Sequence, residues 1–272
     1  MMTRFLMMMA AGGLLWGACV RNTGIRAELP EQITLRPAAS YPHDTGAYTQ
    51  GLVWDDGILY ESTGQYGQST LRHVNPRSGT VSAHVTVPPQ FFAEGLALAG
   101  DSLYLLTWRE KTCFVFDKKT LQKTGQFPYN GEGWGLTFDG QNLIMSDGTS
   151  TLRFLDPKTF KLKRKIEVSD KNRKTKKTYP VRNLNELEWI HGEIWANVWQ
   201  TTQIVRIEPN KGTVIGWIDM TAFVPEKIRR DPAAGRDSVL NGIAFDPKTG
   251  HVYITGKNWD VMYCFKLIVP EQ

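Results

Sequence analysis

A four-residue pattern recurs five times along this chain of 272 residues and restricts its fold more than any other feature. Each copy ends in Leu or Ile, and four copies have Gly just before it; the copies are residues 49–52, 93–96, 133–136, 184–187 and 240–243. Each copy opens a unit of roughly 40 to 55 residues that holds several short apolar stretches separated by polar turns. Repeats of this kind indicate an all-β fold, a five-bladed β-propeller.

The two ends of the repeat region predict how the ring closes. A strand-like stretch at residues 33–41 precedes the first repeat and belongs to none of the five. The fifth repeat has three such stretches, 243–245, 251–255 and 261–268, and then stops, one strand short of a blade. We therefore predict that the N-terminal strand completes the last blade, which would leave no open sheet edge in the ring.

Residues 1–20 differ from the rest of the chain. A basic start at Arg4 is followed by an apolar run, residues 5–16, that is too short to span a bilayer, and then by Gly17-Ala18-Cys19. This pattern predicts an export signal at 1–20 and a tether at 21–31, and the repeats fill a single domain at 32–269. The residues before Cys19 also approximate a lipoprotein cleavage box, so lipidation of Cys19 and plain cleavage both remain open. We expect an exported protein, in the bacterial periplasm or anchored to a membrane as a lipoprotein.

The net charge of +5 comes from one segment. Residues 161–182 hold ten Lys or Arg against Glu167 and Asp170, so the rest of the chain is slightly acidic. Its most basic part, Lys171 to Lys177, has no interleaved aromatic residues and no nucleic-acid motif. We interpret it as a solvated, mobile loop, with attraction to acidic peptides or anionic lipid headgroups as the weaker alternative.

Two long insertions, 169–183 and 221–239, lead from an outer strand into the next inner strand. Connections of this kind emerge at the mouth of the channel where the inner strands begin. Loops there can wall a pocket, so we predict that this mouth is the working face. Cys113 and Cys264 lie in different repeats, and we expect both to be buried, free thiols.

The repeats also locate the residues that face the axis. The residue before each Gly-Leu pair, or its equivalent, should line the channel; these are Gln50, Glu94, Trp134, Asn185 and Asn241. An antiparallel hairpin places the end of its second strand beside the start of its first. The corresponding second-strand positions, Gly64, Trp108, Gly148, Trp199 and Lys257, should therefore ring the same mouth. A repeated position that varies this much indicates function rather than packing.

Several motifs together resemble the glutaminyl cyclase family of plants and bacteria. They include Tyr48-Thr49-Gln50-Gly51-Leu52, Phe92-Ala93-Glu94-Gly95-Leu96, Gly133-Trp134-Gly135-Leu136, Leu184-Asn185-Glu186-Leu187 and Thr255-Gly256-Lys257. The resemblance covers residues 32–268. It implies a five-bladed propeller that converts the N-terminal glutamine of peptides or proteins to pyroglutamate and releases ammonia, without a metal or another cofactor.

By motif, the acid/base carboxylate of the family matches Glu94, and its pocket residues match Gln50, Trp108, Asn185, Trp199 and Lys257. Tyr48 stands where the family usually has Phe, and Trp134 lies in the ring without an assigned chemical role. We take Glu94 and Lys257 as candidate catalytic residues. The candidate substrate-binding residues are Gln50, Trp108, Asn185, Trp199, Tyr48 and Trp134, and we predict no metal ligand.

The chemistry requires few groups. The substrate's own α-amine attacks its γ-carboxamide, so one carboxylate between the two nitrogens could take a proton from the first and return it to the second. Trp108 and Trp199 should hold the aliphatic part of the glutamine. Gln50, Asn185 and Lys257 are donors for the developing oxyanion or for the substrate's backbone, and the sequence does not divide these roles.

Two other classes of protein fit part of the pattern. A metal-dependent propeller hydrolase would need several carboxylates or His at the channel mouth, but the ring positions offer one Glu and no His, and the five His are scattered along the chain. A non-catalytic propeller that binds peptides or sugars stays open as the alternative. We expect a monomer that binds no nucleic acid.

Overall fold

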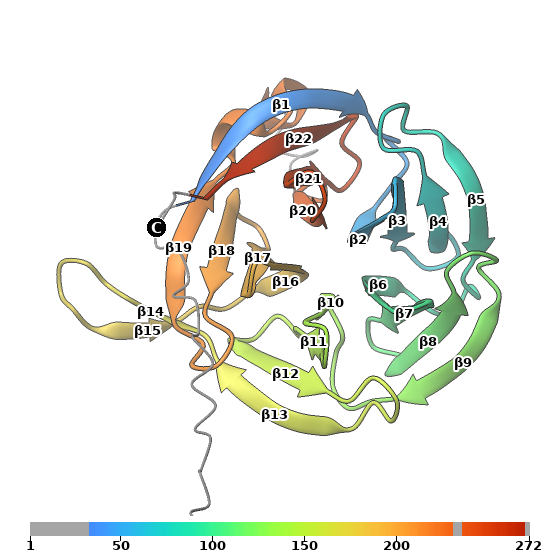
Figure 1. Ribbon diagram of the computed structural model, residues 1–272, viewed down its shortest axis with the longest axis horizontal. Coiled ribbons are helices and arrows are strands. Elements are labelled where there is room, and N and C mark those ends of the chain that lie inside the picture. The colour runs from blue at the N-terminus through green and yellow to red at the C-terminus, as the bar shows by residue number, and fades with distance from the viewer. Residues whose placement is uncertain (1–32, 231–235, 270–272) are drawn as a thin grey trace, which may run out of the picture.

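The computed structural model describes residues 33–230 and 236–269. The predicted signal at 1–20 and tether at 21–31 lie outside the described residues. Figure 1 shows five four-stranded sheets arranged as blades around one axis, with a separate two-stranded sheet at the rim. The prediction of an all-β, five-bladed propeller is confirmed. No helix among the described residues is long and apolar enough to cross a membrane.

The blades follow one another in chain order, each running from an inner to an outer strand. Blade one is β2 (Thr49–Asp55), β3 (Ile58–Thr63), β4 (Thr70–Val74) and β5 (Val81–Thr86). Blade two is β6 (Ala93–Ala99), β7 (Ser102–Thr107), β8 (Thr112–Asp117) and β9 (Lys123–Pro128). Blade three is β10 (Leu136–Phe138), β11 (Leu143–Met145), β12 (Thr151–Leu155) and β13 (Leu162–Glu167). Blade four is β16 (Leu184–Ile190), β17 (Glu193–Val198), β18 (Gln203–Ile207) and β19 (Val214–Asp219).

Blade five contains β20 (Leu240–Asp246), β21 (His251–Gly256) and β22 (Val261–Ile268). The first described strand, β1 (Thr34–Pro42), pairs antiparallel with β22, so that Thr34 faces Ile268 and Pro42 faces Val261. Each inner strand contacts the next around the ring, and β20 contacts β2.

The recurring tetrapeptide forms a β-bulge at the start of the inner strand in four blades. The register between inner and second strand shifts between Thr49 and Gly51, and likewise at 93–96, 184–187 and 240–243. In blade three the copy precedes the short β10. A bulge re-aims a side chain away from the regular alternation. The bulge therefore explains why the variable residue of each copy can face the axis while the next apolar residue packs in the core.

The glycine of the pattern permits close contact between neighbouring blades. A Cβ on Gly51 would lie 2.5 Å from the backbone nitrogen of Leu96, and one on Gly95 would lie 2.5 Å from that of Leu136. Blade four departs from the pattern with Glu186, whose buried carboxylate accepts a hydrogen bond of 2.9 Å from the N–H of Ile243. In blade four, therefore, a side chain takes the place of the close backbone contact and accepts a hydrogen bond from the next inner strand, β20.

The hydrophobic core lies within and between the blades. Trp195 and Trp259 are fully buried in a cluster that joins blades four and five. Cys113 and Cys264 are buried, free thiols as predicted.

The two insertions contain regular structure. Residues 169–183, predicted as a loop, form the two-stranded sheet of β14 (Ser169–Lys171) and β15 (Thr178–Pro180). Its two strands pair antiparallel at three positions, from Ser169 opposite Pro180 to Lys171 opposite Thr178. The run of basic residues gave no sign of this pairing. Residues 221–239 include a 3-10 turn, η1 (Thr221–Phe223), and a short helix, α1 (Glu226–Arg230).

Candidate active site

A cavity of about 220 Å³ lies at the mouth where the inner strands begin. The structure places all eight candidate residues around it and adds Phe92; the lining is Tyr48, Gln50, Phe92, Glu94, Trp108, Trp134, Asn185, Trp199 and Lys257. These residues come from all five blades. The repeated register thus brings residues that are far apart in the sequence to one opening.

Glu94 lies in the bulge of β6, and its backbone carbonyl accepts a hydrogen bond of 2.6 Å from the hydroxyl of Ser62 in blade one. Its side chain is buried, but among the described residues its carboxylate has neither a hydrogen-bond nor an ion-pair partner. Burial raises the pKa of Glu94 well above its usual range; Lys257 opposes this rise, and Glu132 and Glu110 add to it. A carboxylate whose pKa is raised in this way is a stronger base than one in water, so it is better able to accept and return a proton.

Lys257 follows β21 and is also buried. Burial lowers its pKa to about 8, against the opposing effects of Glu94 and Asp237. Its Nζ lies 4.4 Å from the centroid of the Tyr48 ring, so the cation faces an aromatic surface. The pKa of Tyr48 is raised to about 12 by burial and by the charges of Asp237 and Glu94. The Tyr48 hydroxyl therefore stays protonated.

These pKa shifts predict a bell-shaped dependence of kcat/KM on pH. If Glu94 acts as the base, activity should rise as pH increases through its raised pKa, because only the carboxylate accepts a proton. If charged Lys257 is required, activity should fall near pH 8. The Lys257→Arg variant is the control, since a guanidinium stays charged and should shift the alkaline limb upward. A wild-type profile without an alkaline limb near pH 8 would contradict the role of Lys257.

The indoles of the cavity are held by a residue that the repeats did not indicate. Glu132 Oε2 accepts hydrogen bonds from Trp108 Nε1 at 2.8 Å and from Trp134 Nε1 at 3.0 Å. Its other oxygen accepts one from Arg109 Nε at 3.1 Å, and the Arg109 guanidinium lies 3.8 Å from the centroid of the Trp108 ring. Trp134 in turn packs edge-on against Trp199, with 5.5 Å between ring centroids. Glu132 thus fixes one wall of the cavity from outside the lining.

We expect Glu132→Ala to lower kcat/KM by about tenfold to 100-fold, because loss of both indole hydrogen bonds displaces the wall that positions the substrate. Glu132→Gln keeps one acceptor oxygen and should recover part of the loss. Steady-state kinetics on the two variants provide the measurement, with the exposed Glu226→Ala as control. Equal activity of Glu132→Ala and wild type would show that the indoles need no such support.

The side-chain amides of Asn241 and Asn185 lie in different places relative to the cavity. Asn241 is fully buried and is not part of the lining; its Nδ2 donates to the carbonyl of Thr49 at 2.9 Å and to Gln50 Oε1 at 3.3 Å. Because the Gln50 oxygen accepts this bond, its NH₂ group is available to the cavity. Asn185 lines the cavity directly, with its backbone carbonyl bonded to Ser146 Oγ at 2.7 Å. Asn241 therefore positions Gln50, whereas Asn185 can contact a substrate.

Two of the positions predicted to surround the channel mouth, Gly64 and Gly148, are glycines that make room for aromatic side chains. A Cβ on Gly64 would collide with the ring of Phe92, and one on Gly148 would lie 2.7 Å from that of Trp134. Gly148 also has a φ of +77°, which favours glycine. The space left by the two glycines, in blades one and three, is thus filled by aromatic rings that line the cavity.

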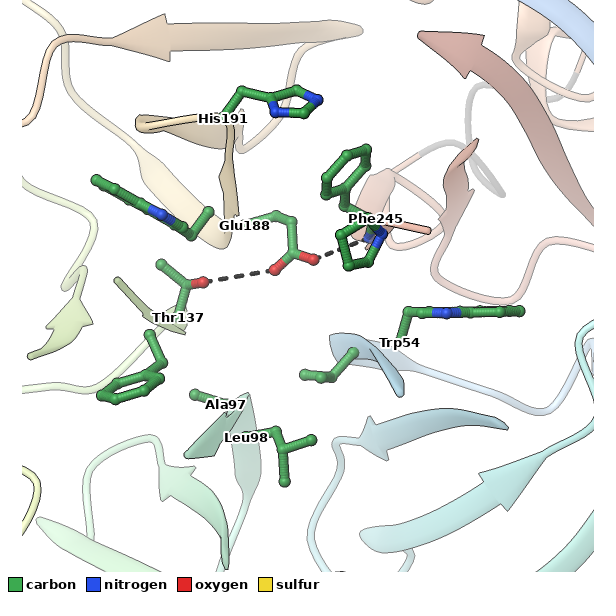
Figure 2. A pocket seen from close by; sticks show the side chains of 11 residues that line it. Trp54, Ala97, Leu98, Thr137, Glu188, His191 and Phe245 are labelled. Carbon is green, nitrogen blue, oxygen red and sulfur yellow. Dashed lines mark hydrogen bonds between the residues drawn. The ribbon is translucent and has the colours of Figure 1, made fainter. Parts of the chain in front are cut away.

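A second cavity, of about 350 Å³, lies at the opposite ends of the inner strands (Figure 2). Most of its lining is apolar, and Glu188 is its only carboxylate. Glu188 accepts 2.8 and 3.4 Å hydrogen bonds from the N–H of Phe245 and the hydroxyl of Thr137. Burial raises its pKa to about 8, although part of the residue remains accessible to solvent. The Glu188 carboxyl group thus accepts a hydrogen bond from the backbone of blade five, and none of the candidate residues lines this second cavity.

Within residues 33–230 and 236–269, no three His, Cys, Asp or Glu side chains gather as a metal site would require. Glu94 is the only such residue among those that line the candidate cavity. Fold and site together define a five-bladed propeller with one acid in an aromatic, amide-lined cavity.

Comparison with known proteins places this class in a family. The family model for glutamine cyclotransferase matches residues 10–267. A glutaminyl-peptide cyclotransferase of Arabidopsis thaliana is 40% identical over 255 residues, which is 93% of this chain and 76% of the relative. The crystal structure of a glutaminyl cyclase from Myxococcus xanthus is 36% identical, with a TM-score of 0.75 over 89% of this chain and all of that one. The chain belongs to the glutamine cyclotransferase family.

Proposed function

We propose that the protein is a glutaminyl-peptide cyclotransferase that converts the N-terminal glutamine of peptides or proteins to pyroglutamate with release of ammonia. The single observation that carries this proposal is the Glu94 carboxylate, which is buried beside the cavity and has no partner among the described residues. The named activity of the Arabidopsis relative supports it.

In the proposed reaction, the α-amine nitrogen of the substrate attacks Cδ of its own side-chain carboxamide. One N–C bond forms, the bond from Cδ to the amide nitrogen breaks, and ammonia leaves. Glu94 takes the proton from the attacking nitrogen and delivers it to the leaving nitrogen, so that no net proton is consumed. The enzyme has only to select the folded-back conformer, because nucleophile and carbonyl belong to one molecule.

The other lining residues are assigned by what they can donate. Negative charge develops on the carboxamide oxygen in the tetrahedral intermediate, and Lys257 is the cation available in the lining. The amides of Gln50 and Asn185 are proposed to fix the substrate's backbone carbonyl or to share the oxyanion. Trp108, Trp199, Trp134 and Tyr48 are proposed to hold the aliphatic part of the glutamine and to exclude water.

We propose that catalysis requires no metal, because one carboxylate in the lining is too few ligands for a structural or catalytic ion. The test is to incubate the protein with a Gln-initiated dipeptide and to follow ammonia, with and without a chelator. Ammonia should appear at equal rates in both. The same dipeptide with an acetylated N-terminus is the control and should release none. Absence of ammonia would reject the activity, and its loss on chelation would reject metal independence.

A non-catalytic propeller that binds peptides or sugars is the second candidate, and the aromatic lining is the observation that favours it. Such a protein would bind a Gln-initiated peptide without releasing ammonia. The same incubation therefore separates the two candidates.

We propose that the catalytic unit is a monomeric domain of residues 32–269.

We further propose that β1 closes the ring as the outer strand of the last blade. Its pairing with β22 supports this role, as does the contact of His43 with blade one, where Nε2 lies 2.9 Å from Glu61 Oε1. Deletion of residues 33–42 is expected to abolish cooperative unfolding, because it exposes β22 and the apolar cluster beneath it. Thermal denaturation tests this, and an unchanged transition would contradict it.

The export signal at 1–20 and the tether at 21–31 are proposals as well, with cleavage before, or lipidation of, Cys19. Mass spectrometry of the protein isolated from its native cells tests them. A processed N-terminus is expected, with or without lipid on Cys19, and an unprocessed Met1 would contradict export.

A further inference from the structure

The two-stranded sheet of β14 and β15 projects from the rim between blades three and four, and Figure 1 shows it outside the circle of blades. We call residues 169–180 the rim hairpin. Its base is tied to blade four, since the N–H of Ser169 donates to the carbonyl of Gly212 at 2.9 Å. The N–H of Val181 donates to the carbonyl of Val168, also at 2.9 Å. The rim hairpin is therefore an anchored projection.

The rim hairpin and the residue that follows Val181 carry a concentration of unpaired positive charge. All six cations are exposed, and none makes an ion pair with a carboxylate of the described residues; they are Lys171, Arg173, Lys174, Lys176, Lys177 and Arg182. Internal ion pairs thus do not explain why these side chains gather there. Their positive field is open to an external anion.

Two aromatic rings lie next to this charge. Asp170, the only acid of the rim hairpin, accepts hydrogen bonds from the Tyr179 hydroxyl at 3.0 Å and from Trp217 Nε1 at 2.9 Å. The two rings remain 40% and 38% exposed, although both are large and apolar. One carboxylate thus holds Tyr and Trp side by side at the surface. Rings of this type, beside Lys and Arg, are typical of protein surfaces at the headgroup level of a bilayer.

The N-terminal end of the described chain emerges on the same side of the propeller. Ile33 and Leu35 pack against the same apolar cluster as Ile218, which follows Trp217 in β19. Figure 1 shows the start of β1 beside the end of β19, and the rim hairpin beside the start of the same strand. The preceding residues include Cys19, whose lipidation is one of the two outcomes proposed above. An attachment to a membrane through a lipid on Cys19 would keep this side of the propeller, with the rim hairpin, near the membrane surface.

We propose that the rim hairpin, together with Trp217, is a contact surface for anionic lipid. The cations meet the headgroups, and Tyr179 and Trp217 enter the interfacial layer. An acidic protein partner would be attracted by the cations, but the exposed ring pair and the position of the N-terminal segment favour a bilayer. Because the rim hairpin lies outside the ring of blades, this contact leaves the mouth of the catalytic cavity open to peptides.

The test is co-sedimentation of the full chain with vesicles of phosphatidylcholine, with and without phosphatidylglycerol. The full chain is used for every variant, so any contribution of residues 1–32 is the same throughout. The hairpin variant combines Lys174→Gln, Lys176→Gln and Lys177→Gln. The control variant combines Arg77→Gln, Lys119→Gln and Lys158→Gln; these residues are exposed in turns of blades one, two and three, outside the rim hairpin, and the variant removes the same charge.

Each cation near an anionic surface strengthens partitioning by about fivefold, so the hairpin variant should bind the anionic vesicles about 100-fold more weakly than wild type. The control variant should bind like wild type, and binding by wild type should weaken with salt. The Trp217→Ser variant should also bind more weakly. All variants should keep their cyclase activity on a soluble dipeptide.

Three results would overturn the proposal. The first is equal loss of binding in the hairpin and control variants, because net charge alone would then suffice. The second is equal binding of wild type to neutral and anionic vesicles. The third is binding to poly-glutamate as tight as that to the anionic vesicles, together with an unaltered Trp217→Ser variant, which would indicate an acidic protein as the partner.

Discussion

Replacing Glu94 with Gln is expected to lower kcat by about 10³-fold while affinity for a Gln-initiated dipeptide stays within a few-fold of wild type. The amide has nearly the shape of the acid, and the backbone of Glu94 is fixed by Ser62, so the cavity should keep its form. The variant loses only the group that can accept a proton from the amine and return it to the leaving nitrogen. Ammonia release measures turnover, and tryptophan fluorescence of the cavity measures binding.

Glu188 offers a matched control for this variant. It too is a carboxyl group whose pKa is raised by burial, but it lies at the other end of the channel and accepts hydrogen bonds from the backbone and from Thr137. Glu188→Gln keeps an acceptor for the N–H of Phe245 and should retain full activity. If Glu94→Gln retained more than a tenth of wild-type turnover, or if Glu188→Gln lost as much, the assignment of the base to Glu94 would be wrong.

Replacing Lys257 with Met is expected to lower kcat/KM by about 10²-fold to 10³-fold, because a preorganised donor for the oxyanion is removed from a site shielded from water. Met has a similar volume, and loss of a buried charge need not destabilise the fold. We therefore expect an unchanged or slightly raised melting temperature. This separates a catalytic defect from unfolding.

The pH profile of the same variant gives a second readout. Lys257 lowers the pKa of Glu94 against the effect of burial, so its removal should move the acid limb of kcat/KM to higher pH. The alkaline limb near pH 8 should disappear, since the group that titrates there is gone. An active Lys257→Met variant with the wild-type profile would show that the ammonium group does not act on the reaction.

The position of the cavity lining could be predicted from internal repetition. Gln50, Glu94 and Asn185 occupy one register position, and Trp108 and Trp199 another, and the antiparallel hairpin brings these positions together. The bulge in the recurring tetrapeptide is the physical reason, because it turns the residue before Gly-Leu away from the strand's alternation. A repeated backbone shape therefore carries the information, even though the side chains differ.

Other parts of the site could not be found in this way. Glu132 holds two indoles but lies outside the repeated register, in the segment that leads into blade three. Phe92 fills the space left by Gly64, a contact between distant residues that no periodicity encodes. Asn241 occupies the predicted register, but it reaches the site only through Gln50. The strands of the rim hairpin were concealed by their polar, charged composition, which is typical of loops.

A crystal structure of Glu94→Gln with a bound Gln-initiated dipeptide would show whether one carboxyl group serves both nitrogens of the substrate, because the substrate can bind without turning over. We expect the side chain of residue 94 within about 2.6 to 3.2 Å of both the α-amine nitrogen and the carboxamide nitrogen. We also expect the aliphatic part of the glutamine between Trp108 and Trp199. A dipeptide bound in this cavity with residue 94 beyond reach of either nitrogen would contradict the role of Glu94 as the proton shuttle.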